Sequence, residues 1–375
     1  MDLKKACTLL ELKEKWLQPF DVVDPFSELR LEGYLSLKPD HRYGALALLK
    51  VNERNAAQRI LATPKLHYPF DRAGTFRFPP VRKIDIYEKI DGTNVFAYLF
   101  KDAENRWHVT YKLRLHPVLR NGKWGRFLDM WKEMLKRYPQ IPELPNINRC
   151  ALSFELFGAR NALLMVYETP LACALLFGVE PDGRYRSIDE LDCGDVPVPT
   201  HLGALTAGED PIAAYARIRE KLQSTIQTRD DDRLSGYEGA VWYVTTTRME
   251  RVLFKCKPES VEAIHWKGGI NKGAVMATLW NMLETDDILA YGKLEQLLLE
   301  EYSQEEIDAF RSHIDACMAA VNEELAFREQ VLTAYNRVGI RLSEDKARVM
   351  RKLSEQFPRA MMKKVYTLIS MYGTE

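Results

Sequence analysis

The chain has 375 residues, which is enough for two or three domains with cores of their own. Apolar residues make up 46% of it and charged residues 28%, so an intrinsically disordered or fibrous chain is excluded. Because 53 basic residues balance 53 acidic ones, the chain lacks the strongly basic character of many nucleic-acid-binding proteins. Local clusters of charge must therefore supply any such function.

The cysteine spacing and the distribution of apolar residues give no sign of a metal site, a disulfide framework or a membrane segment. The six cysteines are scattered, with no Cys-x-x-Cys pair, which argues against a zinc site or a disulfide framework. No apolar run approaches the ~20 residues of a membrane span, and no apolar signal core follows Met1. We expect a cytoplasmic monomer with no membrane association.

Residues 1–80 form a first region whose fold the sequence does not assign. Apolar positions between charges predict an amphipathic helix within residues 3–17. Residues 43–51 resemble a strand and residues 53–61 a short helix, and the stretch that follows to residue 80 is rich in aromatic residues and proline. We expect this region to pack on the domain that follows it.

Residues 81–260 change to short β-type runs separated by turn residues. Strands are predicted at residues 83–89, 94–100, 107–114, 150–157, 171–180, 240–245 and 252–257, and helices at 125–137 and 211–225. The pattern indicates a core of largely antiparallel sheets flanked by helices.

Residues 261–375 are predicted to be an all-helical domain, so the fold class is α+β. Helices are expected at residues 274–290, 291–301, 343–357 and 359–371. Ser303 and Glu306 form a capping box, which opens a further helical run with apolar residues on one face as far as Leu325. Gly268 and Gly269 would supply a flexible joint to the sheet core.

Four short motifs carry the chemical information, and each lies on a β-type run. They are, in chain order, Glu88-Lys89-Ile90-Asp91-Gly92-Thr93-Asn94, Ser153-Phe154-Glu155-Leu156-Phe157-Gly158, Glu238-Gly239-Ala240-Val241 and Phe254-Lys255-Cys256-Lys257. The sequence has no G-x-x-x-x-G-K-[ST] loop, so a nucleoside triphosphate would need another mode of binding. A lysine nucleophile whose pKa is lowered by nearby cations is such a mode.

Together these motifs resemble motifs I, III, IV and V of the covalent nucleotidyltransferases, the superfamily of polynucleotide ligases and mRNA capping enzymes. The resemblance covers residues 83–260 and implies a nucleotidyltransferase (ATP-grasp-like ligase) core. It implies that Lys89 is the nucleophile, and that Lys255 and Lys257 lower its pKa and balance the charge of the α-phosphate.

The resemblance also implies roles for the other motif residues. Glu155 would bind the ribose, and Phe157 and Val241 would enclose the adenine. Glu238 would hold Mg²⁺ (Mn²⁺ being an alternative), and Asp91 would either share this task or cap its own turn. Further nucleotide contacts are expected from Glu88, Ile90, Asn94 and Arg114, although Arg114 alone would read as a surface strand residue.

The helical end distinguishes the members of this superfamily. DNA ligases and capping enzymes continue into a β-barrel, whereas a helical domain is similar to that of RNA ligases. We therefore expect an ATP-dependent RNA ligase that joins RNA 5′-phosphate and 3′-hydroxyl ends through lysyl-AMP. Two alternatives remain: another enzyme of the superfamily (DNA ligase or capping guanylyltransferase), and a catalytically silent nucleic-acid-binding relative.

Charge patterning predicts where RNA would bind. Residues 341–364 hold eight bases and three acids, and Arg348, Arg351 and Lys352 lie at the centre of this segment. Each of these residues alone reads as part of a solvated helix face. As a cluster they are candidates to contact RNA phosphates.

Overall fold

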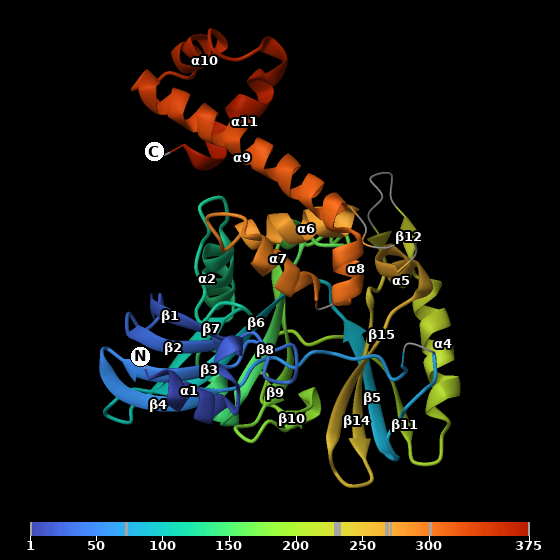
Figure 1. Ribbon diagram of the computed structural model, residues 1–375. Coiled ribbons are helices and arrows are strands. Elements are labelled where there is room, and N and C mark those ends of the chain that lie inside the picture. Colours follow the sequence, from blue (N-terminus) through green and yellow to red (C-terminus); the bar gives the residue numbers. More distant parts are fainter. Residues whose placement is uncertain are drawn as a thin grey trace.

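The computed structural model describes residues 2–71, 74–228, 234–266, 270, 272–299 and 302–373. It confirms the α+β class: antiparallel sheets are flanked by helices, and helices make up the described chain after residue 258 (Figure 1). The predicted joint at Gly268 and Gly269 lies outside the described residues.

The N-terminal region forms a helix and a four-stranded antiparallel meander. Its elements are α1 (Leu3–Leu10), β1 (Leu17–Val23), β2 (Arg30–Ser36), β3 (Leu46–Val51) and β4 (Arg54–Ile60), with a short 3-10 helix at Glu14–Trp16. Apolar residues of α1 pack on one face of this sheet, while residues of its other face join a core shared with the rest of the protein. Residues of this meander and of the central sheets therefore share one apolar cluster.

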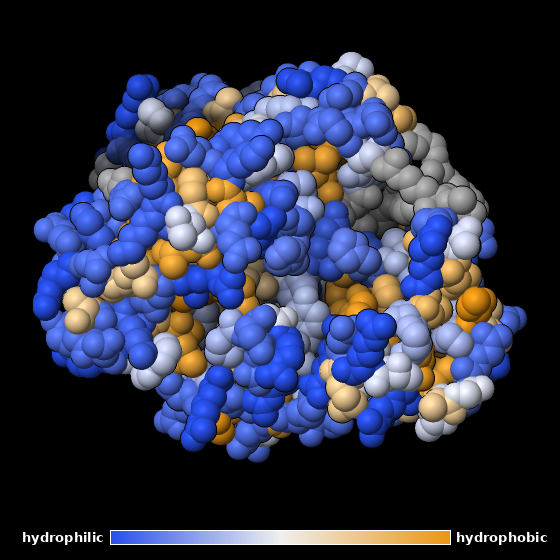
Figure 2. Space-filling model, turned by 60° about the horizontal axis from the view of Figure 1, so that its bottom comes forward, coloured by the Kyte–Doolittle hydropathy of each residue, from blue (hydrophilic) through white to orange (hydrophobic). Residues whose placement is uncertain are grey.

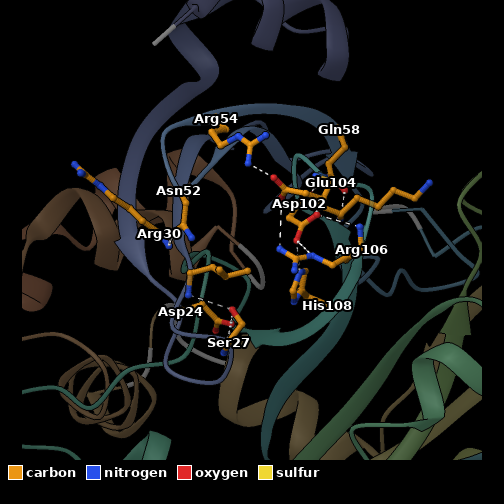
Figure 3. A network of polar contacts seen from close by, with 12 residues as sticks. Asp24, Ser27, Arg30, Asn52, Arg54, Gln58, Asp102, Glu104, Arg106 and His108 are labelled. Carbon is orange, nitrogen blue, oxygen red and sulfur yellow. Dashed lines mark hydrogen bonds and ion pairs between the residues drawn. The ribbon is translucent and has the colours of Figure 1, made fainter.

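A polar junction fixes this meander to the next sheet (Figure 3). The side-chain amide of Gln58 donates to the carbonyl of Lys101 and accepts from its N–H, both at 2.8 Å. Nearby, Arg54 forms an ion pair with Glu104. The Gln58 side chain thus makes the two hydrogen bonds that a neighbouring strand would make with the main chain of Lys101. It holds β4 beside the strand that contains Lys101.

Two larger antiparallel sheets form the centre of the molecule. The first, in the order β10-β9-β8-β6-β7, consists of β6 (Thr93–Lys101), β7 (Trp107–Lys112), β8 (Ala151–Phe157), β9 (Ala172–Val179) and β10 (Tyr185–Arg186). The second, in the order β11-β5-β14-β15, consists of β5 (Val81–Lys89), β11 (His201–Thr206), β14 (Gly239–Thr246) and β15 (Arg251–Cys256). Two-residue strands β12 (Gln227–Thr228) and β13 (Leu234–Ser235) pair separately.

Apolar side chains hold these layers together. Tyr87 and Val241 of one sheet share a core with Phe96 and Phe177 of the other. The outer faces are covered by helices: α2 (Phe127–Arg137) packs on the first sheet, and α4 (Pro211–Gln223) on the second. Two further helices are α3 (Leu144–Asn148) and α5 (Glu259–Trp266), and 3-10 turns lie at Ala159–Asn161 and Ile188–Glu190.

The helical region has two parts. The first, which we call the cavity cover, is α6 (Lys272–Leu283) and α7 (Tyr291–Leu298), and it lies across the ends of the central strands (Figure 1). From it, α8 (Gln304–Ala309) leads into α9 (Arg311–Val338), which extends away from the body. The second part, the distal unit, is the far end of α9 with α10 (Lys346–Ser354), a 3-10 turn at Arg359–Met361 and α11 (Met362–Tyr372), which share a separate apolar core.

Three predictions of secondary structure were wrong or incomplete. The helix expected at 53–61 is strand β4, because pairing with β3 and the Gln58 contacts override local preference. Strands β1 and β2 were not predicted. The apolar helical run after Ser303 is broken at Phe310, where α8 ends, although the predicted capping box of Ser303 and Glu306 is present.

The surface is mainly polar in the view of Figure 2, where apolar residues form small separate patches. No described helix combines the length and the hydropathy that a bilayer span requires.

Candidate functional site

A cavity of about 860 Å³ lies where the two central sheets meet the cavity cover. Its sheet-side wall contains predicted site residues: Lys89, Asp91, Asn94, Arg114, Glu155, Glu238 and Lys257. The opposite wall comes from α6, α7 and their flanks, including Asn281, Asp286 and Lys293. The cavity has the size of a ligand site for a small organic molecule.

A buried carboxylate bridges two lysines at the floor of the cavity. The Nζ of Lys89 lies 2.5 Å from Oε2 of Glu238, and the Nζ of Lys257 lies 3.0 Å from Oε1. Side chains of Glu238 and Lys257 are each 4% exposed, whereas that of Lys89 is 21% exposed. Lys89 is therefore the member of the trio most open to an incoming ligand.

Strand pairing explains how three distant residues meet. Lys89 ends β5 and pairs with Gly239, which begins β14 directly after Glu238. Ala240 pairs with Cys256, the last residue of β15, and Lys257 follows it. Because these strands are antiparallel neighbours, the end of β5, the start of β14 and the end of β15 share one edge of the sheet.

The charged groups of the trio shift the pKa values of Lys89 and Glu238. Burial lowers the pKa of Lys89, but the Glu238 carboxylate, with a smaller contribution from Glu155, raises it, and the net shift is upward. Burial raises the pKa of Glu238, while Lys89 and Lys257 together bring it below its usual value. Lys89 is therefore held protonated and Glu238 ionised, because opposite charges in a buried setting stabilise one another. In this state the pKa of Lys89 is raised, and not lowered as predicted from the sequence.

Asp91 lies in the turn after Lys89 and is held by main-chain donors. Its Oδ2 accepts the N–H groups of Leu164 at 2.7 Å and Met165 at 2.6 Å. Burial raises its pKa to about 6, and the Glu238 carboxylate adds to the rise. The next residue must be Gly92, because a Cβ there would lie 2.3 Å from the carbonyl oxygen of Leu156.

Glu155 points into the cavity from β8 and pairs in register with Asn94 of β6. Asn94 Nδ2 lies 3.3 Å from Glu155 Oε2 and 2.8 Å from Ser153 Oγ, so the amide donates to two side chains of β8. Burial raises the pKa of Glu155 to about 8. This carboxyl group can therefore present a hydrogen-bond donor as well as acceptors near neutral pH.

Five of the residues predicted for the nucleotide site do not line the cavity. Val241 is buried in the core between the sheets, Ile90 is buried, and Glu88 is half-buried beside β14. Phe157 packs edge-on against Tyr167, with ring centroids 5.0 Å apart. The Nζ of Lys255 lies 4.8 Å from the centre of the Tyr68 ring, so the two motif V lysines have different surroundings.

Sequence reasoning missed the wall formed by the cavity cover. Lys293 of α7 lies 2.5 Å from Asp286, and both approach the imidazole of His116. Asn281 of α6 donates to Thr93 Oγ1 at 3.0 Å. No local pattern marks these residues, since they reach the site only when the helices pack on the core.

The carboxylate groups of the cavity can supply part of the ligand set of a divalent cation. Among the described residues, no group of three or more His, Cys, Asp or Glu side chains is arranged to hold a metal ion. Glu238 and Asp91 nevertheless line one cavity. One or two carboxylates completed by substrate phosphates are the usual ligand set of Mg²⁺, so these residues fit the ion in that form.

The predicted RNA-binding residues lie elsewhere. Arg348, Arg351 and Lys352 are exposed on α10 in the distal unit, which Figure 1 shows beyond the far end of α9. The structure therefore separates this cluster from the cavity.

Comparisons with known proteins gave matches only among solved structures. No family model and no curated protein matches the chain. An archaeal ATP-dependent RNA ligase is 13% identical with a TM-score of 0.47, and covers 89% of this chain and 83% of its own. A putative ATP-dependent DNA ligase from Aquifex aeolicus is 14% identical, with a TM-score of 0.43 and coverages of 86% and 78%.

A Naegleria gruberi RNA ligase mutant with ATP and Mn is 15% identical, with a TM-score of 0.34 and coverages of 49% and 52%. These three structures, described as RNA or DNA ligases, are each 15% identical to this chain or less.

Proposed function

We propose that the protein is an ATP-dependent RNA ligase that works through a lysyl-AMP intermediate. The observation that carries the proposal is the trio of Lys89, Glu238 and Lys257 on the floor of a cavity with two further carboxyl groups, Asp91 and Glu155. A lysine that is partly exposed, beside a second buried lysine, suits attack on a phosphorus atom whose charge the second lysine balances.

The reaction follows from these positions. The neutral amine of Lys89 attacks the α-phosphorus of ATP, the bond to the bridging oxygen breaks, and pyrophosphate leaves with that electron pair. The Lys89 ammonium first loses one proton to solvent to become this amine, and its nitrogen loses a second proton to solvent as the N–P bond forms. Lys257 lies beside the phosphoryl group in transfer and offsets its negative charge.

Two later steps complete the joining. An oxygen of the RNA 5′-phosphate attacks the phosphorus of lysyl-AMP, and Lys89 leaves as the amine. The RNA 3′-hydroxyl then attacks the activated 5′-phosphate, forms the phosphodiester bond and releases AMP.

A divalent cation, Mg²⁺ or Mn²⁺, would be held by Glu238 and Asp91 with phosphate oxygens. When bound it supplies positive charge that offsets the phosphates and favours the neutral form of Lys89. Glu155 is assigned to the ribose, because a buried carboxyl group can bind hydroxyl groups by hydrogen bonds.

RNA is proposed as the substrate on two grounds. After β15 the described chain is helical, unlike the β-barrel that follows the core in DNA ligases and capping enzymes. The exposed bases of α10 suit binding to phosphates.

The test is covalent labelling. Incubation with ATP labelled at the α-phosphate, followed by denaturing electrophoresis and intact mass, should show one AMP on Lys89. Lys89→Ala should abolish the adduct, since Lys257, the other lysine of the trio, is only 4% exposed, whereas Lys89 is 21% exposed. Persistence of the adduct in that variant would disprove the assignment, and labelling by GTP alone would favour a capping enzyme.

A further inference from the structure

Another buried lysine, Lys112, lies near the cavity, and the proposed reaction gives it no role. Lys112 is the last residue of β7, and it is 1% exposed. Its Nζ donates to three main-chain carbonyls: that of Gly44 at 2.9 Å, that of Leu113 at 2.9 Å and that of Arg114 at 3.3 Å. A buried ammonium group is retained only where such acceptors replace its water.

These three acceptors come from two parts of the molecule. Leu113 and Arg114 begin the segment 113–116, and every residue of that segment lines the cavity. Gly44 lies in the connection between β2 and β3 of the N-terminal meander. A single ammonium group thus joins the cavity wall to the N-terminal region.

The contact between the two segments is too close for other residues. Gly44 has a φ of +85°, and a Cβ there would lie 2.3 Å from the carbonyl oxygen of Arg114. The side chain of Arg114 continues the same contact, since it donates to the carbonyl of Thr63 at 2.8 Å and lies 5.6 Å from the centre of the Tyr43 ring. The N-terminal region therefore supports both the backbone and the side chain of Arg114.

We propose that Lys112 is a positioning residue: its ammonium group fixes the backbone of Leu113 and Arg114 against Gly44, and so determines where the Arg114 guanidinium stands in the cavity. The inference rests on the proposed function, in which this cavity binds ATP. It also gives residues 1–80 a role, which is to support this wall from behind.

The chemistry of lysine suits this task. An ammonium group offers three donors to three carbonyls from one point, whereas methionine of similar length offers none and glutamine two. Burial and, to a smaller extent, the Arg114 charge lower the pKa of Lys112 to about 7, so the carbonyl oxygens are needed to keep the group charged.

The experiment compares the full-length chain with Lys112→Met, Lys112→Gln, Arg114→Ala and the double variant Lys112→Met with Arg114→Ala. Two quantities are measured: the rate of lysyl-AMP formation as a function of ATP concentration, and the equilibrium Kd of ATP. We expect Lys112→Met to raise KM and Kd about tenfold, with a smaller change in the rate at saturating ATP. Lys112→Gln should recover part of the loss. Lys50→Met, on β3 and away from the cavity, is the matched control.

The double variant separates positioning from general stability. If Lys112 acts through Arg114, Lys112→Met should cost much less in the Arg114→Ala background than in the wild type. Equal losses in both backgrounds, or an unchanged KM and Kd, would overturn the inference.

Failure of folding, failure of adduct formation and failure of ATP binding can each be told apart in this experiment. If Lys112→Met does not fold, Lys112→Gln replaces it in the same cycle and is judged by the same criterion. If the wild type binds ATP without forming an adduct, the proposed function fails while the Kd cycle still decides the role of Lys112. If it does not bind ATP, both fail.

Discussion

Cations of the cavity and cations of the distal unit differ in their surroundings. In the cavity, Lys89 and Lys257 share the Glu238 carboxylate at 2.5 and 3.0 Å, with little exposure to solvent. On α10, Arg348, Arg351 and Lys352 are exposed along one helix. Buried groups of opposite charge interact strongly at short distances, so they suit catalysis at one defined position. Exposed charges of one sign suit salt-dependent binding of a polyanion.

The same comparison divides the helical region into two. The cavity cover lines the site and contacts the core, whereas the distal unit has its own apolar core. A chain that ends near residue 270 would lose one wall of the cavity, so adenylation is expected to need the cover as well as the sheets.

Glu238→Gln should have the largest effect. Loss of the carboxylate that organises the lysines and the proposed metal should lower the adenylation rate by about 1,000-fold, or roughly 4 kcal/mol. The pKa of Lys89 should fall at the same time, because the charge that raises it is gone while burial remains. Amine-specific labelling of Lys89 at pH 8 should therefore increase while adenylation decreases. A slower labelling rate would contradict the account of the trio.

Glu155→Gln should change stability in a pH-dependent way. The folded pKa of about 8 exceeds the ordinary 4.5, so the unfolded chain releases this proton first and the free energy of unfolding falls as pH rises from 4.5 to 8. Glutamine removes this penalty and still accepts from Asn94. Denaturant unfolding should show the variant more stable by about 2–4 kcal/mol at pH 9, and the difference should vanish near pH 4. A difference that does not depend on pH would refute the prediction.

Gly125→Ala should displace the cavity cover. A Cβ at this position would lie 2.1 Å from the Cα of Glu284, at the end of α6. We expect adenylation to fall about tenfold, because a small shift of a cavity wall misplaces the bound nucleotide. Gly292→Ala is the matched control: it lies in α7, nothing lies within 4 Å of the added Cβ, and alanine favours helix. Equal behaviour of the two variants would show that the cover does not matter for this step.

Charge reversal on the distal unit should have the smallest effect on chemistry. Arg348→Glu, Arg351→Glu and Lys352→Glu together should weaken RNA binding and reduce the slope of log K against log salt by about 2, since fewer counterions are released. Adenylation should be unchanged. Reversal of Lys4, Lys13 and Lys15, which are exposed in the N-terminal region, serves as the control. An unchanged slope in the α10 variant would identify these residues as a solvated face.

The sequence predicted the parts of the fold in which local pattern and burial agree. Strands β5, β6, β8, β14 and β15 alternate or cluster apolar residues as buried strands do, and the helices after residue 270 follow their 3.6-residue period. Strand β4 was missed because its residues favour a helix, and only the contacts of Gln58 with Lys101 and the pairing with β3 make it extended.

The candidate site divides in the same way. Short motifs on separate strands predicted Lys89, Glu155, Glu238 and Lys257 as site residues. Antiparallel pairing of β5, β14 and β15 brings Lys89, Glu238 and Lys257 to one edge of their sheet, and Glu155 reaches the same cavity from β8 of the other sheet. Tertiary structure alone brought Lys293 and Asn281 to the opposite wall, turned Lys255 toward Tyr68, and buried Lys112 against Gly44. The reason is physical: local sequence determines which residues form a strand and which face each one presents, whereas the pairing of strands far apart in the chain and the approach of a helix depend on packing between distant surfaces.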